Sequence, residues 1–159
     1  LIVMSPKSLL RHRRAVSTMD DLAEGSFQRI IADDPAIDPK NVKRLLLCTG
    51  KIYYDLLERR EREGREDIGI MRIEQLYPLR ASELQTCLAP YARDVDLVWV
   101  QEEPWNQGAW YFMRARLPEI LGSEQPVRCI ARPESASPAT GSGASHKLEQ
   151  KMLLDEVFH

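Results

Sequence analysis

Apolar runs and helical repeats alternate along the chain from Val42 onward, and this alternation limits the folds that the sequence can adopt. Each apolar run is short and almost unbroken, and a segment whose apolar residues recur every three or four positions follows it. Strands that alternate with helices in this way predict an α/β domain whose parallel sheet is covered by helices on both faces. The runs that we expect to be strands are Val42–Cys48, Ile68–Ile73, Val95–Val100 and Val127–Ala131.

The helical repeats show which residues should pack on the sheet. Glycine at the end of the first repeat, Gly64, predicts the end of that helix. The last repeat, Leu148–Phe158, is a plausible final helix. Three earlier helices are predicted, each with one apolar face. These faces are formed by Ile52, Tyr53, Leu56 and Leu57; by Leu84, Cys87, Leu88 and Tyr91; and by Trp110, Met113 and Leu117.

The first 39 residues lack this regularity, and we interpret them as an arm and linker. Leu1–Met4 is strand-like and is closed by a proline. Ser17, followed by two aspartates, predicts the start of a short helix that ends at Gly25. Phe27–Ile31 is strand-like and should join the sheet that follows. We therefore expect residues 1–39 to be an arm with one edge strand, and residues 40–159 to be the α/β domain.

Charge and composition exclude several functions. The sequence has 22 lysines and arginines against 24 aspartates and glutamates, a net charge of −2, which argues against a general nucleic-acid-binding protein. No apolar stretch approaches the ~20 residues of a membrane-spanning helix. Cys48, Cys87 and Cys129 are odd in number and widely spaced, so we expect buried free thiols in a reducing compartment, with neither disulfides nor a zinc site.

The densest group of polar and aromatic residues follows the third apolar run. Adjacent carboxylates, amides and indoles leave a buried strand together there, and each polar group left unpaired in the interior would cost about 1–3 kcal/mol. They must be exposed, paired internally or matched to a partner. We rank a subunit or domain contact first, helix capping second and catalysis last. The candidate interface residues are Gln101, Glu102, Glu103, Asn106, Gln107 and Trp110.

Other polar residues at predicted strand ends leave alternatives open. Gly50 either makes a plain tight turn or exposes amides to an anion. Arg132 either clamps an anion or pairs with Glu102 or Glu103, and we favour the ion pair slightly. Arg11, Arg13 and Arg14 are either solvated or neutralise an anion or an acidic surface. No phosphate loop and no Ser-His-Asp arrangement is present in the sequence.

Several segments together resemble the carboxyl-terminal part of the first, thiamine-diphosphate-dependent component of 2-oxoglutarate dehydrogenase, in the transketolase superfamily. The resemblance implies a three-layer α/β/α fold with a mostly parallel five-stranded sheet and one antiparallel edge strand, Phe27–Ile31. It also implies that Leu1–Met4 belongs to a preceding pyrimidine-binding domain. The segments that carry the resemblance are Leu1–His12, Cys48–Leu56, Arg72–Pro78, Gln101–Trp110 and Arg132–Ala139.

The resemblance further implies a role in assembly. The parent enzymes of this family decarboxylate 2-oxoglutarate and transfer succinyl to the lipoyl group of the dihydrolipoyl succinyltransferase component, in the bacterial cytoplasm or the mitochondrial matrix. They are homodimers, and this domain contributes to dimerisation and contacts the preceding domains. The family's magnesium motif is absent from this sequence, so we expect thiamine diphosphate and magnesium to bind outside the chain. No catalytic, cofactor-binding or metal-binding residue is assigned, and the isolated chain should be inactive.

There are two alternatives to this interpretation, and one segment departs from the sequence pattern of the family. Arg11, Arg13, Arg14 and Arg132 are candidates for a regulatory site for an adenine nucleotide or acetyl-CoA. The chain could also be a free-standing interaction module. The departure is the glycine-rich approach to the last helix, Gly141–His146, which puts the docking of that helix in doubt because glycine loses much backbone entropy on ordering.

Overall fold

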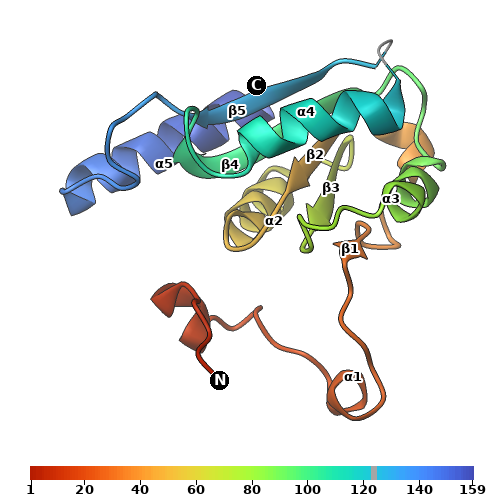
Figure 1. The fold of residues 1–159 in the computed structure, drawn as a ribbon, viewed down its shortest axis with the longest axis horizontal. Coiled ribbons are helices and arrows are strands. Elements are labelled where there is room, and N and C mark those ends of the chain that lie inside the picture. The colour runs from red at the N-terminus through yellow and green to blue at the C-terminus, as the bar shows by residue number, and fades with distance from the viewer. Residues whose placement is uncertain (123–124) are drawn as a thin grey trace.

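A five-stranded sheet forms the centre of the computed structural model, which describes residues 1–122 and 125–159 (Figure 1). The order of the strands is β1-β3-β2-β4-β5. β1 runs antiparallel to β3, and the other neighbouring pairs are parallel, as the resemblance implied. The bounds are β1 (Ile30–Ile31), β2 (Arg44–Cys48), β3 (Ile68–Ile73), β4 (Asp96–Pro104) and β5 (Val127–Arg132).

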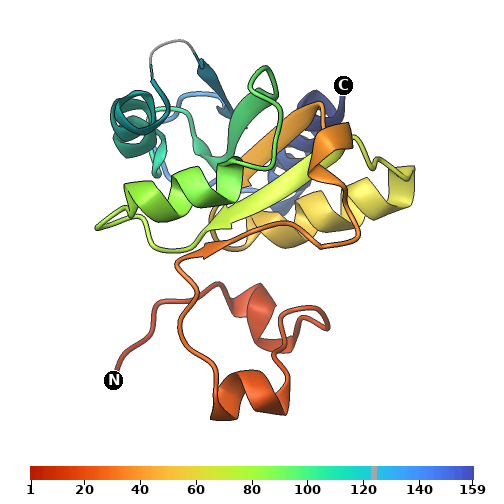
Figure 2. The same ribbon diagram turned by 90° about the vertical axis from the view of Figure 1, so that its right-hand side faces the viewer.

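Helices cover both faces of the sheet, which confirms the predicted three layers (Figures 1 and 2). On one face, Leu46 and Val98 pack with helix residues such as Leu56 and Leu153. On the other, Trp99 and its neighbours pack with buried residues of the remaining two helices. The first face carries α2 (Ile52–Glu63) and α5 (Gly143–Phe158), and the second carries α3 (Ala81–Leu88) and α4 (Trp110–Leu121).

The predicted helix faces and boundaries largely agree with the structure. Trp110, Met113 and Leu117 are all buried, and Gly64 ends α2 with a φ of 62°, in the left-handed region that favours glycine. Tyr91 lies beyond the end of α3. β4 is longer than its predicted apolar run and continues through a register shift to Pro104. The polar residues after Val100 therefore begin inside the strand.

The arm differs from its prediction in detail. Leu1–Met4 forms no strand in this structure and is fully or largely exposed. The helical segments are η1 (Lys7–Arg11), α1 (Met19–Ala23) and η2 (Pro39–Asn41). The side chain of Thr18, one residue after the predicted Ser17, caps α1 in a reciprocal capping box with Asp21. The helix has Glu24 as its C-cap, and Gly25 follows directly, where a Cβ would clash with Asp21 O.

A buried ion pair holds the linker against the sheet. Arg60 Nη1 lies 2.5 Å from Asp33 Oδ2, and both side chains are almost fully buried. The same carboxylate oxygen accepts a hydrogen bond from the amide of Ile70 on β3, 2.8 Å away. Because β1 is only two residues long, Asp33 satisfies a β3 amide that a longer edge strand would otherwise pair.

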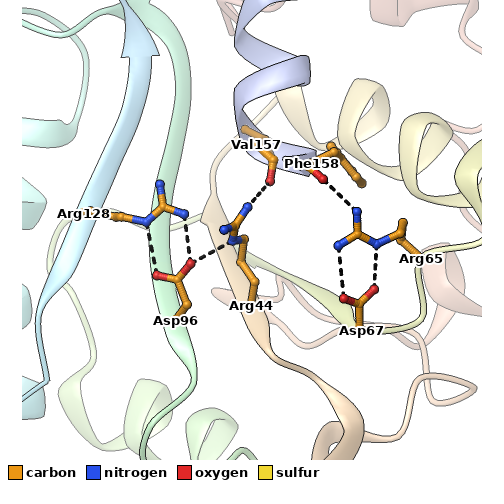
Figure 3. A network of polar contacts seen from close by, with 7 residues as sticks. All are labelled: Arg44, Arg65, Asp67, Asp96, Arg128, Val157 and Phe158. Atoms are coloured by element: carbon orange, nitrogen blue, oxygen red, sulfur yellow. Dashed lines mark hydrogen bonds and ion pairs between the residues drawn. The ribbon is translucent and has the colours of Figure 1, made fainter.

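The last helix docks, contrary to the doubt raised by its glycine-rich approach. Leu153, Val157 and Phe158 are buried. Two arginines hold the carboxyl end of α5: Arg44 Nη1 donates to Val157 O over 2.6 Å, and Arg65 Nη1 donates to Phe158 O over 2.7 Å (Figure 3). Cations at this end complement the partial negative charge of the helix dipole and satisfy carbonyls that have no partner within the helix.

Candidate functional site

The carboxyl ends of β2 and β4 lie side by side at the point where the strand order reverses. In open α/β sheets, ligands commonly bind at this position. Lys51 follows β2, and its Nζ lies 2.6 Å from Glu102 Oε2 on β4. The same ammonium group lies 3.8 Å from Asp55 Oδ2, at the start of α2. The predicted carboxylate at this edge is therefore matched by a lysine of the same chain.

The polar contacts continue from Asp55 to the start of α5. Gln150 Nε2 donates to Asp55 Oδ2 over 2.7 Å, and Arg132 Nη2 donates to Gln150 Oε1 over 2.7 Å. Arg132 Nη2 also lies 3.0 Å from His146 Nδ1, and Arg132 Nη1 lies 3.5 Å from Glu149 Oε2. The favoured pairing of Arg132 with Glu102 or Glu103 is wrong, because α5 supplies closer partners for this buried guanidinium.

Gln101 is a structural hub inside the domain. Its Oε1 accepts from the Trp99 indole and from the Trp110 amide, both over 3.0 Å. Its Nε2 donates to Pro104 O over 3.1 Å and to Gln107 O over 2.7 Å. The amide side chain thereby closes the turn that joins β4 to α4.

Gly108 in the same turn leaves no room for a larger residue. A Cβ at this position would lie 3.0 Å from the Gln101 amide, and the φ of 67° is strained for any other L residue. The hydrogen bonds of Gln101 therefore require glycine at position 108, and they in turn hold the turn closed.

The candidate interface residues divide into interior and surface groups. Gln101 and Trp110 are buried within the chain and offer little surface to a partner. Glu103 and Asn106 are exposed. Asn106 exchanges hydrogen bonds with the backbone of Ser135, and Gln107 Nε2 also donates to Ser135 O. Much of the segment is thus paired internally, one of the outcomes that the sequence left open.

The structure does not gather the four candidate anion-binding arginines. Arg11 and Arg13 are exposed on the arm. Arg14 Nη2 lies 2.6 Å from Glu61 Oε2, near the end of α2. Arg132 lines a separate cavity of about 200 Å³ beneath the loop that follows β5. A single ligand therefore has no common set of these guanidiniums to bind.

A different set of cations lines a cavity of about 470 Å³ between the arm, α2 and α5, which we name the arm cavity. Ser8, Leu9 and His12 form its arm side, and the His12 ring packs against Tyr54 with the centroids 4.8 Å apart and the planes tilted by 48°. The sequence did not predict this cavity, because its walls come from three distant segments. Gly50, which precedes the lining residue Lys51, was one of the positions at which the sequence left anion binding open. The lining cations are Lys51, Arg59, Arg62, Lys147 and Lys151.

Among the residues that the structure describes, the thiols and carboxylates show no arrangement for covalent or metal chemistry. Burial raises the pKa of Cys48 to about 12, so this thiol is not an activated nucleophile. Within residues 1–122 and 125–159, no three His, Cys, Asp or Glu side chains lie together as a metal site would require. In this part of the chain no helix has the length and apolar character needed to cross a bilayer.

The family model described as "2-oxoglutarate dehydrogenase C-terminal" matches residues 16–158, and so includes the linker, the whole sheet and its helices. The chain belongs to this family. It is also similar to the 2-oxoglutarate dehydrogenase E1 components of Azotobacter vinelandii and Haemophilus influenzae, at 47% identity to each over 99% of the chain. The 2-oxoglutarate dehydrogenase E1/E2 component of Corynebacterium glutamicum is 40% identical over 99% of the chain.

The chain covers a small part of these relatives. It spans 17% of the length of the Azotobacter and Haemophilus proteins and 13% of the Corynebacterium protein. Membership of the 2-oxoglutarate dehydrogenase C-terminal family accounts for the fold. Sequence identity over so small a part of the relatives does not by itself assign their activity or their partners to this chain.

Proposed function

We propose that the chain is the C-terminal assembly and dimerisation domain of a 2-oxoglutarate dehydrogenase first component. In this proposal the parent enzyme decarboxylates 2-oxoglutarate and passes succinyl to the lipoyl group of a dihydrolipoyl succinyltransferase. Thiamine diphosphate and magnesium are bound by polypeptide outside this chain, and the isolated chain is inactive. The bacterial relatives favour a cytoplasmic enzyme among the two expected compartments.

The exposed apolar arm carries this proposal. Side chains of this kind are normally covered, and a contiguous exposed group of them marks a protein contact. The arm makes few contacts with the domain and lies to one side of it in both views (Figures 1 and 2). We assign its cover to the preceding domains of the same enzyme. The nine side chains, each at least 69% exposed, are Leu1, Ile2, Val3, Met4, Leu10, Val16, Met19, Leu22 and Phe27.

The second contact of the proposal is the surface part of the turn after β4. Glu103 and Asn106 are exposed there, and Trp105 lies between them, its ring 5.4 Å from that of Tyr111. Aromatic side chains are enriched in protein interfaces. We assign this turn to the contact with the second subunit of the homodimer, with Gln101 and Trp110 supporting it from inside.

The arm contact is tested in the full-length enzyme. Leu22→Glu and Phe27→Glu should each lower the midpoint of thermal unfolding, because a charge replaces an apolar contact with the preceding domains. Met152→Glu is the matched control, since Met152 is 59% exposed on α5 and outside the arm. Equal unfolding midpoints for the arm variants and the control would refute the arm contact.

The subunit contact is tested by sedimentation of the same enzyme. Glu103→Lys should raise the dimer dissociation constant, because it reverses a charge on the proposed contact. It is a cleaner change than Glu102→Lys, which would also break the pair with Lys51. An unchanged dissociation constant for Glu103→Lys would count heavily against dimerisation through this turn, whatever the arm variants show.

The regulatory alternative, in which four arginines hold an adenine nucleotide or acetyl-CoA, has less support. Arg132 is buried among α5 side chains, and Arg14 is paired with Glu61. The alternative of a free-standing module has no specific observation in its favour. We therefore retain the assembly domain as the proposed function.

A further inference from the structure

The contact between Arg132 and His146 fixes the protonation state of the imidazole. Arg132 Nη2 lies 3.0 Å from His146 Nδ1. A guanidinium has donors and no acceptor, so Nδ1 must accept the hydrogen bond and the ring proton must lie on Nε2. An imidazolium carries a proton on each nitrogen and cannot accept. The hydrogen bond therefore exists only while His146 is neutral.

Arg132 depends on α5 for the partners of its guanidinium. The residue is only 7% exposed, so water supplies few acceptors. Besides His146, its partners on the helix are Gln150 Oε1, 2.7 Å from Nη2, and Glu149 Oε2, 3.5 Å from Nη1. Its Nε is buried and makes no hydrogen bond with the described residues. Because a buried charge is costly unless it is hydrogen-bonded, the loss of one acceptor matters at this position.

The start of α5 has little apolar packing of its own. Residues 141–148 are all exposed, and the first buried residue of the helix is Leu153. Gly143, the first residue of α5, loses much backbone entropy when it becomes ordered. The contacts that Arg132 makes with the helix therefore fasten a segment that would otherwise be weakly held.

Protonation of His146 would turn an attraction into a repulsion. The imidazolium would face the guanidinium of Arg132 and follow the positive end of the α5 dipole, with Lys147 next to it in the chain. It would also compete for the carboxylate of Glu149, three residues further along the same helix. Arg132 would then retain only Gln150 as an undisturbed partner on α5.

The groups on other elements offset little of this repulsion. Asp55, at the start of α2, lies 3.8 Å from Lys51 Nζ and accepts from Gln150, and Glu102 on β4 is paired with Lys51. Glu134, in the loop after β5, lines the cavity beside Arg132 but is itself exposed. The remaining charged and titratable groups in the arm cavity are His12, Arg59, Arg62 and Lys151.

We propose that the contact between Arg132 and His146 is a pH-sensitive switch, which holds the start of α5 to the end of β5 when His146 is neutral and releases it when His146 is protonated. Imidazole changes its charge between about pH 5 and pH 8, whereas carboxylates ordinarily titrate near about pH 4 and keep their charge over that interval. The end of α5, held by Arg44 and Arg65, should stay docked. The inference goes beyond the assembly role and does not depend on it.

Hydrogen exchange of the full-length enzyme at pH 7.5 and pH 5.5 tests the switch, once the rates are corrected for the pH dependence of intrinsic exchange. Corrected exchange of residues 143–150 should be about tenfold faster at pH 5.5, because a hydrogen bond to a charged group is lost. Residues 153–158 of the same helix should exchange equally at the two pH values and serve as the internal control.

Two substitutions fix the charge at position 146. His146→Asn keeps an acceptor oxygen near the place of Nδ1 and does not titrate, so residues 143–150 should exchange slowly at both pH values. His146→Lys carries a positive charge at both, and this segment should exchange fast at both. His12→Gln removes the other histidine of the arm cavity and is the matched control, which should keep the wild-type response.

Equal corrected exchange of residues 143–150 at the two pH values in the wild-type enzyme overturns the proposal. A pH response that persists in His146→Asn also overturns it, because another group must then titrate. So does loss of the response in His12→Gln, which would assign it to the wrong histidine. None of these outcomes involves the dimer dissociation constant, so the proposed assembly role stands or falls separately.

Discussion

The guanidinium of Arg44 joins the first residue of β2 to the last turn of α5, 113 residues later, by a hydrogen bond of 2.6 Å from Nη1 to Val157 O. Its Nε donates to Asp96 Oδ2 over 2.8 Å, and Asp96 also accepts from Arg128. One arginine thus ties the starts of β2 and β4 and the end of the last helix into one network at the amino edge of the sheet (Figure 3).

Removal of this arginine should loosen the last helix. We expect Arg44→Met to lower the free energy of unfolding by about 1.5–3 kcal/mol, the usual contribution of hydrogen bonds to charged groups. Hydrogen exchange should accelerate most at Leu153–Phe158. Arg116→Met, which breaks the exposed pair with Glu119, is the control and should change stability much less. Unchanged exchange at the end of α5 in Arg44→Met would show that the Arg44 hydrogen bond does not hold the end of the helix.

The apolar pattern predicted the sheet and its helices because burial and periodicity act locally. Ile68–Ile73 is a strand with the predicted bounds, and α2 ends at Gly64 as predicted. The docking of α5 was in doubt because the sequence nearby shows only its glycines. The groups that hold its carboxyl end, Arg44 and Arg65, are far away in sequence.

The polar site was predicted less well, for a related reason. Many charged residues compete for partners, and only the folded chain decides which of them meet. Arg132 was expected beside Glu102 or Glu103, but it contacts Gln150, while Lys51 reaches Glu102. Gln101 was assigned to a surface contact because it follows an apolar run. The alternation along β4 instead places it on the same face as the buried Trp99, whose indole donates to its amide oxygen.

The buried pair of Asp33 and Arg60 should be a major determinant of stability. Removing one partner leaves an uncompensated buried charge, so Arg60→Met should cost about 3–5 kcal/mol in urea unfolding. Asp33→Asn should also be destabilising and should increase exchange of the Ile70 amide, which loses a charged acceptor. The double variant should be less destabilised than the sum of the two single variants. Strict additivity would contradict direct coupling of the pair.

The three thiols should differ sharply in alkylation rate. Burial raises the pKa of Cys48 and of Cys129 to about 12, whereas Cys87 on α3 has a smaller upward shift in pKa. Because the thiolate is the reactive form, Cys87 should react first with iodoacetamide at pH 8. Cys48, with no exposed surface, should react only when the chain unfolds. Mass spectrometry of timed samples gives the order, and early labelling of Cys48 would contradict the burial of β2.

Acid should weaken the amino-edge network through Asp96. Hydrogen bonds from Arg128 first, and then from Arg44, hold the pKa of this carboxyl below its ordinary value of 3.8. A carboxyl whose pKa is lower in the folded than in the unfolded chain stabilises the fold fully above the unfolded pKa. It loses that contribution as the pH falls through the folded pKa.

The free energy of unfolding should therefore contain a contribution from Asp96 that is constant near neutral pH and declines below about pH 4. Asp96→Asn should lower stability at pH 7 and flatten the decline in acid, since the amide cannot titrate. The difference between the variant and the wild-type chain should shrink as the pH falls through the folded pKa of Asp96, because the wild-type carboxyl then also becomes neutral. Urea unfolding at several pH values measures this difference, and a difference that stays constant from pH 7 to pH 2 would show that Asp96 acts through packing and not through its charge.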